Sequence, residues 1–136
     1  MPEYLNVQTH SRVEMVDVTT ALGNVLSSNV PKGWIDGFLV VYSPHTTCGV
    51  TINEGWDPDV KRDMMDLFSK YIPRDGGFRH AEGNADAHIK TSIYGASVMV
   101  PVAAGRLDLG QWQSVYLCES DGPRIRKLRI SFVKAE

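Results

Sequence analysis

The chain has 136 residues, of which 43% are hydrophobic and 22% charged, and its net charge is −2. This length and composition are typical of one globular domain that buries its own core. The charge argues against a protein built to neutralise nucleic-acid phosphates. Two cysteines are too few for a disulfide framework, and no apolar run resembles a signal peptide or a membrane span. We therefore expect a single domain over 1–136, a cytoplasmic location, and no nucleic-acid or membrane partner.

The first half of the chain alternates between strand and helix patterns. Apolar and polar residues alternate over 4–10, which predicts a half-buried strand. Apolar residues then recur at helical spacing over 15–28, which predicts a helix, and Pro31, Gly33 and Gly37 break the chain after it. The apolar run 38–43 predicts a buried strand, and a second strand is expected over 48–54.

A clear helix signal follows. Asp57 is a good N-cap, Pro58 suits the first helical position, and Pro73 ends the pattern. The glycine-rich, polar stretch 74–82 has the composition of a loop. A shorter helix is expected over 84–94, closed by a glycine.

The C-terminal third is rich in strand patterns. Strands are expected over 97–102, 106–110, 112–119 and 124–134, with a turn at 104–105. Hairpins rather than βαβ units join these strands. The order of elements predicts an α+β fold in which two or three helices pack on a largely antiparallel sheet.

Three of the four histidines lie in two short polar segments, 43–47 and 79–90, whereas His10 has no polar partner nearby and is expected at the surface. The second segment also holds two carboxylates and an amide. Imidazoles with a carboxylate or water are the usual ligands of zinc. The candidate metal ligands are therefore His45, His80 and His88. Their spacing matches no standard zinc motif, so ordinary surface or core histidines are the alternative.

Two acidic residues stand beside these histidines. Glu82 and Asp86 are candidates for general acid–base catalysis, for orienting an imidazole, or for binding Mg²⁺. Together with His88 they form the candidate catalytic set. The alternative is that they are acids at a helix N-terminus that complement the helix dipole.

Anion binding is expected at the start of the 84–94 helix, where backbone N–H groups and a glycine suit a phosphate. Loops of this composition bind nothing in most proteins, which is the alternative. The candidate substrate- and phosphate-binding residues are Thr46, Thr47, Arg79, Gly83, Asn84, Lys90, Gln113 and Arg124.

A covalent mechanism is not favoured by the available nucleophiles. Cys48 and Cys118 have apolar strand neighbours, which predicts buried and unreactive thiols. Ser43 and Ser92 lack the context of a nucleophile elbow.

Three long segments carry a family resemblance: SPHTTCGVTINEGWDPDVKRDM (43–64), RHAEGNADAHIKTSIYGASVMVPV (79–102) and GRLDLGQWQSVYLCESDGPR (105–124). They resemble the YjbQ-like family, described as secondary thiamine-phosphate synthases. The resemblance implies an α+β fold, a homotrimer, and a histidine-rich pocket that binds metal. It also implies condensation of a pyrimidine pyrophosphate with a thiazole phosphate. The chain departs from the pattern at Ala104, where a polar turn residue is typical, and at Cys48 and Gly49.

Two classes of function remain. The first is a metal-assisted enzyme acting on a phosphorylated small molecule. Its reaction would be thiamine-phosphate synthesis, as the family resemblance implies, or metal-dependent hydrolysis. Zinc is the expected metal, and magnesium would suit a pyrophosphate substrate. The second class is a non-catalytic trimer that binds a metal or ligand.

Overall fold

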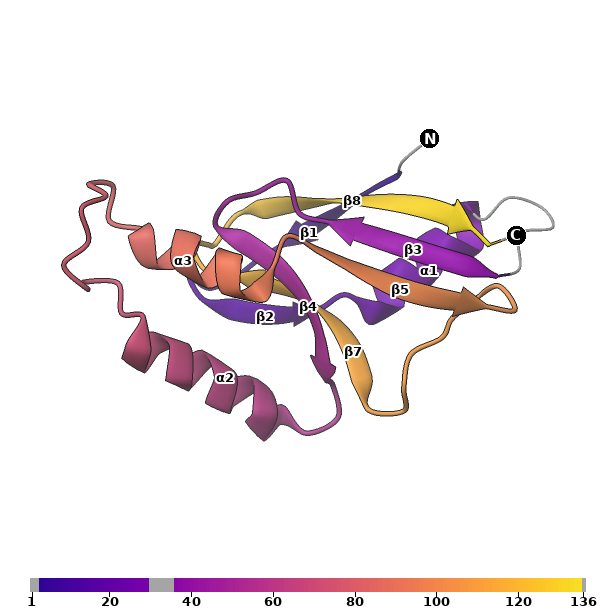
Figure 1. The fold of residues 1–136 in the computed structure, drawn as a ribbon, viewed down its shortest axis with the longest axis horizontal. Helices are drawn as coiled ribbons and strands as arrows, with labels where there is room; N and C mark the ends of the chain where they lie inside the picture. Colours follow the sequence, from indigo (N-terminus) through magenta and orange to yellow (C-terminus); the bar gives the residue numbers. More distant parts are fainter. Residues whose placement is uncertain (1–2, 30–35, 136) are drawn as a thin grey trace.

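Eight strands and three helices make up residues 3–29 and 36–135, which are the residues that the computed structural model describes. Pro31 and Gly33 of the predicted break lie outside these residues, and Gly37 begins the strand that follows it. In chain order the elements are β1 (Glu3–Gln8), β2 (Glu14–Asp17), α1 (Thr19–Asn29), β3 (Gly37–Tyr42), β4 (Cys48–Glu54), α2 (Pro58–Tyr71), α3 (Ala85–Tyr94), β5 (Ser97–Ala103), β6 (Arg106–Leu107), β7 (Gln113–Glu119) and β8 (Ile125–Lys134), as Figure 1 shows.

The strands form two antiparallel sheets. One has five strands in the order β1-β8-β3-β5-β6, and the other has three in the order β2-β7-β4. Every strand pair is antiparallel. The predicted α+β class with antiparallel sheets and three helices is therefore confirmed.

The main core lies between the two sheets and α1. Leu39 of β3 and Leu128 of β8 face Val50 of β4 across it, and Leu22 and Leu26 of α1 close one side. All five are buried, and replacing such a leucine with alanine costs about 2–5 kcal/mol. This core fixes the position of the loop that leaves β3 and enters β4.

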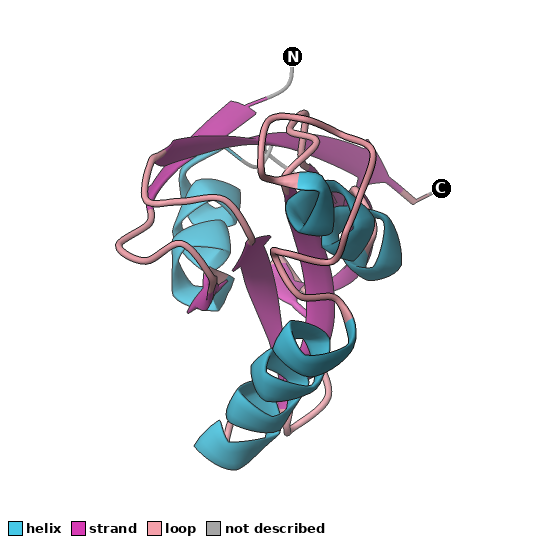
Figure 2. Cartoon of the chain, turned by 90° about the vertical axis from the view of Figure 1, so that its left-hand side faces the viewer, coloured by secondary structure: helices cyan, strands magenta, loops and turns pink. Residues whose placement is uncertain are grey.

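Helix α3 packs on the other face of the three-stranded sheet, and α2 approaches that face through Met64 and Met65 (Figure 2). Met15 of β2 and Tyr116 of β7 form a second cluster there with Met64 of α2 and Tyr94 of α3. The end of α3 approaches β4 closely: a Cβ added at Gly49 would lie 2.7 Å from the carbonyl oxygen of Gly95. The glycine thus permits α3 to pack against β4, the strand that follows His45, Thr46 and Thr47 (the HTT segment).

The predicted helix over 15–28 is wrong at its start. Residues 14–17 form β2, in which Met15 pairs with Cys118 of β7, and α1 begins only at Thr19. The Val18 amide donates to the Val115 carbonyl at 2.9 Å, which extends the contact with β7 to the helix boundary. Pairing across the sheet overrides the local helical pattern here.

Other local predictions are confirmed. Helix α2 begins at Pro58, and the Asp57 carboxylate accepts from the Asp59 amide at 2.9 Å as its N-cap. The turn at Ala104 and Gly105 has φ angles of 52° and 75°, so an alanine occupies a conformation that favours glycine or asparagine. No helix among the described residues is long and apolar enough to cross a membrane.

Candidate functional site

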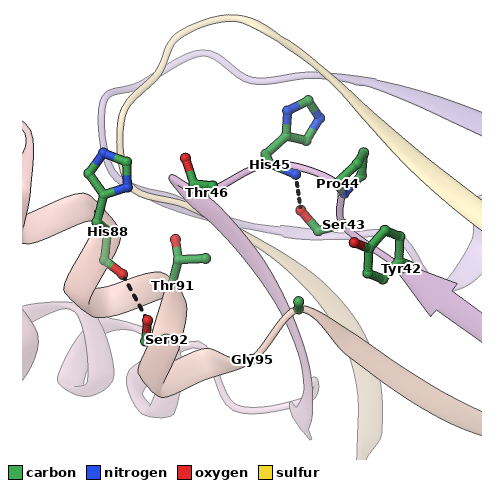
Figure 3. A pocket seen from close by; sticks show the side chains of 10 residues that line it. Tyr42, Ser43, Pro44, His45, Thr46, His88, Thr91, Ser92 and Gly95 are labelled. Carbon is green, nitrogen blue, oxygen red and sulfur yellow. Dashed lines mark hydrogen bonds between the residues drawn. The ribbon is translucent and has the colours of Figure 1, made fainter.

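A pocket of about 560 Å³ lies between the β3–β4 loop and α3 (Figure 3). It brings together the HTT segment (45–47) and the end of the GNADAH segment (83–88), which are far apart in the sequence. Its lining residues are Tyr42, Ser43, Pro44, His45, Thr46, His88, Thr91, Ser92, Gly95 and Ala96.

Hydrogen bonds hold the β3–β4 loop in place. The Ser43 hydroxyl donates to the Cys48 carbonyl at 2.6 Å, which closes the loop upon itself. The Ser43 amide donates to the Ala96 carbonyl at 2.7 Å, joining the loop to the segment after α3. Because Ser43 is buried and its hydroxyl is engaged, it serves the loop's structure and is not a free nucleophile.

His45 stands on this loop with its ring tied to β8. The backbone N–H of Lys127 donates to Nε2 of His45 at 2.9 Å. Partial burial lowers the pKa of His45, and the positive charge of Arg126 lowers it further. Both effects favour the neutral ring.

The helix side of the pocket carries a hydroxyl without a partner. Thr91 is 7% exposed, and its Oγ1 has no hydrogen-bond partner among the described residues. Figure 3 shows this hydroxyl pointing from α3 toward Thr46. Buried polar groups are nearly always paired, because an unpaired one costs about 1–3 kcal/mol. The Thr91 hydroxyl is therefore an unsatisfied polar group on the helix side of the pocket.

Of the three candidate metal ligands, His80 and His88 contact each other, whereas His45 makes a separate contact with β8. The rings of His80 and His88 meet edge to face with centroids 5.2 Å apart, and Nε2 of His80 lies 4.0 Å from Oε2 of Glu82. His45 is held by Lys127 instead. Within the described residues, no three His, Cys, Asp or Glu side chains gather closely enough to hold a metal ion. A three-histidine metal site is therefore not formed within one chain.

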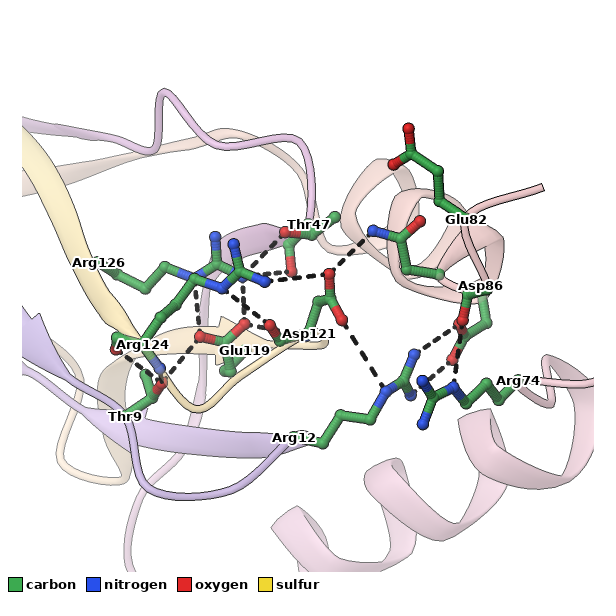
Figure 4. A network of polar contacts seen from close by, with 12 residues as sticks. Thr9, Arg12, Thr47, Arg74, Glu82, Asp86, Glu119, Asp121, Arg124 and Arg126 are labelled. Carbon is green, nitrogen blue, oxygen red and sulfur yellow. Dashed lines mark hydrogen bonds and ion pairs between the residues drawn. The ribbon is translucent and has the colours of Figure 1, made fainter. Parts of the chain in front are cut away.

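The expectation that Asp86 is an available acid or base is not supported. The side chain is fully buried, and both carboxylate oxygens accept from Arg12, at 3.0 and 3.1 Å (Figure 4). Lys90 is also buried and donates to the same carboxylate at 3.2 Å. Burial acts to raise the pKa of Asp86, but the hydrogen bonds from Arg12 and Lys90 outweigh it, and the pKa is lowered. Asp86 and Lys90 satisfy each other, so neither is free for a substrate.

Thr47 likewise belongs to a buried network rather than to the pocket. Its hydroxyl accepts from Arg126 at 2.9 Å, and Arg126 also makes two hydrogen bonds to the carboxylate of Glu119. The Thr9 hydroxyl donates to the same carboxylate at 2.9 Å. These four buried residues lie at the end of the core between the two sheets.

Asn84 and Arg124 both point to Asp121. The Asn84 amide donates to Oδ2 of Asp121 at 2.9 Å, and Arg124 donates to the Asp121 carbonyl at 2.9 Å. Asn84 is the N-cap residue of α3, but its side chain makes no capping hydrogen bond. Neither side chain lines the pocket.

The remaining phosphate candidates are scattered. Gly83 has a φ angle of 79°, and its carbonyl accepts from Arg74 at 3.1 Å. Arg79 is exposed in the loop before α3. Gln113 lies at the opposite end of β7 from Glu119, where its side chain accepts from the Gly110 amide at 2.8 Å. Of the eight substrate- and phosphate-binding candidates, Thr46 lines the pocket.

Sequence reasoning overlooked Thr91 and Arg12. Thr91 lies three residues after His88 on α3, a spacing that places both on one helix face and could have suggested it. Arg12 is 74 residues from Asp86 in the sequence, and no local pattern predicts that the two side chains pair. The predicted burial of both cysteines is confirmed, and burial raises the pKa of Cys48 to about 12.

Comparison with known proteins decides the family. Residues 3–135 match the family described as UPF0047 protein YjbQ-like. The chain belongs to the YjbQ-like family. It is 45% identical to UPF0047 protein YugU of Bacillus subtilis, over 98% of this chain and 99% of that protein. It is 42% identical to a UPF0047 protein of Methanocaldococcus jannaschii, over 93% of this chain and 90% of that one.

Solved structures of the YjbQ-like family share the fold. A YjbQ/UPF0047 protein from Clostridium acetobutylicum superposes with a TM-score of 0.90 at 39% identity, covering 96% of this chain and 99% of that one. A hypothetical protein from Aeropyrum pernix gives a TM-score of 0.90 at 34% identity, covering 99% of both chains.

Proposed function

We propose that this YjbQ-like chain is an enzyme acting on a phosphorylated small molecule in the pocket between the β3–β4 loop and α3. The observation that carries the proposal is the buried, unpaired hydroxyl of Thr91 in the wall of a pocket that also contains His45 and His88. A phosphate oxygen would satisfy that hydroxyl, and Thr46 offers a second one beside it. Neighbouring Arg126 and Arg124 contribute positive potential at His45.

The proposed reaction is thiamine-phosphate synthesis, the reaction that the family resemblance implies. The bond between the pyrimidine methylene carbon and the pyrophosphate oxygen breaks, and the pyrophosphate leaves with the bonding electrons. The thiazole nitrogen then supplies its lone pair to form the new carbon–nitrogen bond. Thr91, Thr46 and His45 would stabilise charge on the departing oxygens, and no covalent enzyme intermediate is needed.

Zinc or magnesium was expected to assist, but one chain offers only a limited site for it. His80 and His88 supply two adjacent imidazoles, and the remaining ligands would come from water, substrate or a second chain. Bound there, a divalent metal would neutralise pyrophosphate charge. Metal analysis of purified protein, before and after chelation, tests this part separately.

We also propose a homotrimer. The outward face of the five-stranded sheet supports self-association, because it presents exposed apolar side chains that none of the described helices covers: Tyr4, Phe38, Tyr42, Met99 and Val133. Light scattering at micromolar concentration should give three times the mass of one chain. A monomeric mass would contradict the assembly.

The decisive assay is turnover of the pyrimidine pyrophosphate and thiazole phosphate by purified protein. Thr91→Val keeps the side-chain shape and removes the hydroxyl, so turnover should fall by about 10-fold or more, since a hydrogen bond to a charged group contributes about 1.5–3 kcal/mol. Stability should be unchanged or slightly higher, because the lost group was unpaired. Thr20→Val on α1, outside the pocket, is the matched control. Equal turnover by Thr91→Val and wild type would contradict the proposed site.

A non-catalytic binding protein is the second candidate. One observation favours it: the pocket offers hydrogen-bond donors, whereas the carboxylate of Asp86 is sequestered and Glu82 is 78% exposed outside the pocket. Calorimetric binding of both substrates without turnover would select this candidate.

A further inference from the structure

The ring of His45 is held by a backbone N–H group of a neighbouring strand. The Lys127 backbone N–H lies on β8 and donates to Nε2 at 2.9 Å, so the ring is anchored to the five-stranded sheet rather than to its own loop. At the loop end, the His45 amide donates to the Ser43 hydroxyl at 3.3 Å. Backbone and ring are therefore held from two directions.

This hydrogen bond determines where the His45 proton resides. An N–H group can donate only to a ring nitrogen that carries no proton, so Nε2 is unprotonated. A neutral imidazole then bears its single proton on Nδ1. Nδ1 has no hydrogen-bond partner among the described residues, and His45 lines the pocket.

We infer that His45 is a fixed Nδ1–H donor that contacts an anionic oxygen of the pocket's ligand, and that it is not a metal ligand. The choice of a phosphate or pyrophosphate oxygen as acceptor rests on the proposed function. The tautomer rests on the Lys127 contact alone.

Metal binding by His45 would disrupt this arrangement in either orientation. Coordination through Nε2 would require the lone pair that already accepts from Lys127. Coordination through Nδ1 would move the proton to Nε2, where it would face the Lys127 N–H donor to donor. Among the described residues, no backbone N–H donates to the rings of His80 or His88, which instead contact each other, and His80 also lies near Glu82; this separates the roles of the histidines.

The surrounding charges support a neutral donor. Burial disfavours the imidazolium form of His45, and Arg126 and Arg124 disfavour it further, while Glu119 acts in the opposite direction. The ring pKa is lowered as a result. A neutral donor beside arginines suits an anionic ligand, because the protein need not ionise the ring to bind it.

Nitrogen NMR of the imidazoles tests the tautomer directly. In ¹⁵N-labelled protein near pH 7.5, the His45 signals, identified by their loss in His45→Asn, should show a protonated Nδ1 and an unprotonated Nε2. Zinc should shift the signals of His88 and leave those of His45 in place. A proton on Nε2, or a zinc-induced shift of both His45 nitrogens, would overturn the inference.

Two substitutions test the donor role with inorganic pyrophosphate as the probe. His45→Asn places an amide near the Nδ1 position, whereas His45→Gln places one near the Nε2 position. Calorimetry should show a loss of about 10-fold or more in affinity for His45→Gln, the size of one hydrogen bond to a charged group, and a smaller loss for His45→Asn. Circular dichroism checks that both variants fold.

The outcomes separate this inference from the proposed function. If pyrophosphate binds and neither variant nor the Nδ1 signal responds, His45 is not its donor. If pyrophosphate does not bind the wild type, the proposed function fails, and donation to phosphate fails with it. The spectrum decides the tautomer in either case.

Discussion

The two loops that carry the histidines are built in contrasting ways. The β3–β4 loop, residues 43–47, is fastened by buried hydrogen bonds from Ser43 and Arg126 and by the contact of His45 with β8. The α2–α3 loop, residues 72–84, is almost entirely exposed.

This difference assigns separate tasks to the two loops. A hydrogen-bond donor is most effective when its geometry is set before the ligand arrives, and the β3–β4 loop supplies such donors. A loop with few buried contacts opens at low free-energy cost. The α2–α3 loop should therefore be displaced at lower free-energy cost than the β3–β4 loop, which lines the pocket.

Breaking the fastened loop should have the largest effect. Arg126→Met leaves the buried carboxylate of Glu119 without a positive charge to pair with, and we expect a loss of about 3–5 kcal/mol in the free energy of unfolding. Urea denaturation measures it. Arg62→Met removes an exposed ion pair on α2 and should change stability by less than about 1 kcal/mol. Equal effects of the two substitutions would mean that the buried network does not secure the loop.

The base of α3 should respond somewhat less. Asp86→Asn keeps an acceptor but removes the charge that neutralises Arg12 and Lys90, so we expect a loss of about 2–3 kcal/mol. The exposed Asp108→Asn is the control. Asp86 does not touch the pocket, so ligand affinity of the folded variant should stay near that of the wild type. A large loss of affinity at full stability would restore Asp86 as a site residue.

Acid should weaken the same contacts gradually. The folded-state pKa values of Glu119 and Asp86 are lowered, because hydrogen bonds from Arg126 and Arg12 outweigh the effect of burial. Their contribution is therefore complete above the unfolded-state pKa values and is lost as pH falls through the folded-state values. Melting temperature should decline from about pH 5 downward. Glu119→Gln should decline less steeply over this range, and an identical pH profile would contradict the assignment.

The exposed loop should show the smallest change in stability. His80→Ala should alter the free energy of unfolding by less than about 0.5 kcal/mol, because the side chain packs against little besides His88. Zinc affinity should nevertheless fall by about 10-fold if the two rings share a metal. His10→Ala, another exposed histidine, is the control. Unchanged zinc binding by His80→Ala would remove this pair as the metal site.

Local patterns predicted most of the fold. The cap at Asp57 and the strand over 48–54 appear in the structure as expected, because both depend on neighbours in the sequence. Strand β2 was missed, because its four residues precede a helix and become a strand only by pairing with β7. That information lies about a hundred residues away.

The functional site itself stays a prediction, and the structure shows only which of its residues lie together. His45, Thr46 and His88 line one pocket. The sequence does not reveal which charged candidates are buried in ion pairs and which are exposed. Asp86 and Lys90 have the i, i+4 spacing of an ordinary exposed ion pair, yet both are buried. Arg12, which is 74 residues away in the sequence, donates to both oxygens of the buried Asp86 carboxylate.

Gly49 sets the distance between β4 and the end of α3, which forms one wall of the pocket. An added methyl group there would approach the Gly95 carbonyl at 2.7 Å and Cβ of Tyr94 at 3.0 Å, so α3 would have to move away from β4. Gly95 lines the pocket, whereas Gly49 does not. The width of the cavity is thus governed by a residue behind it. A substitution at Gly49 would therefore change the size of ligand that the pocket accepts, while every residue that lines the pocket stays the same.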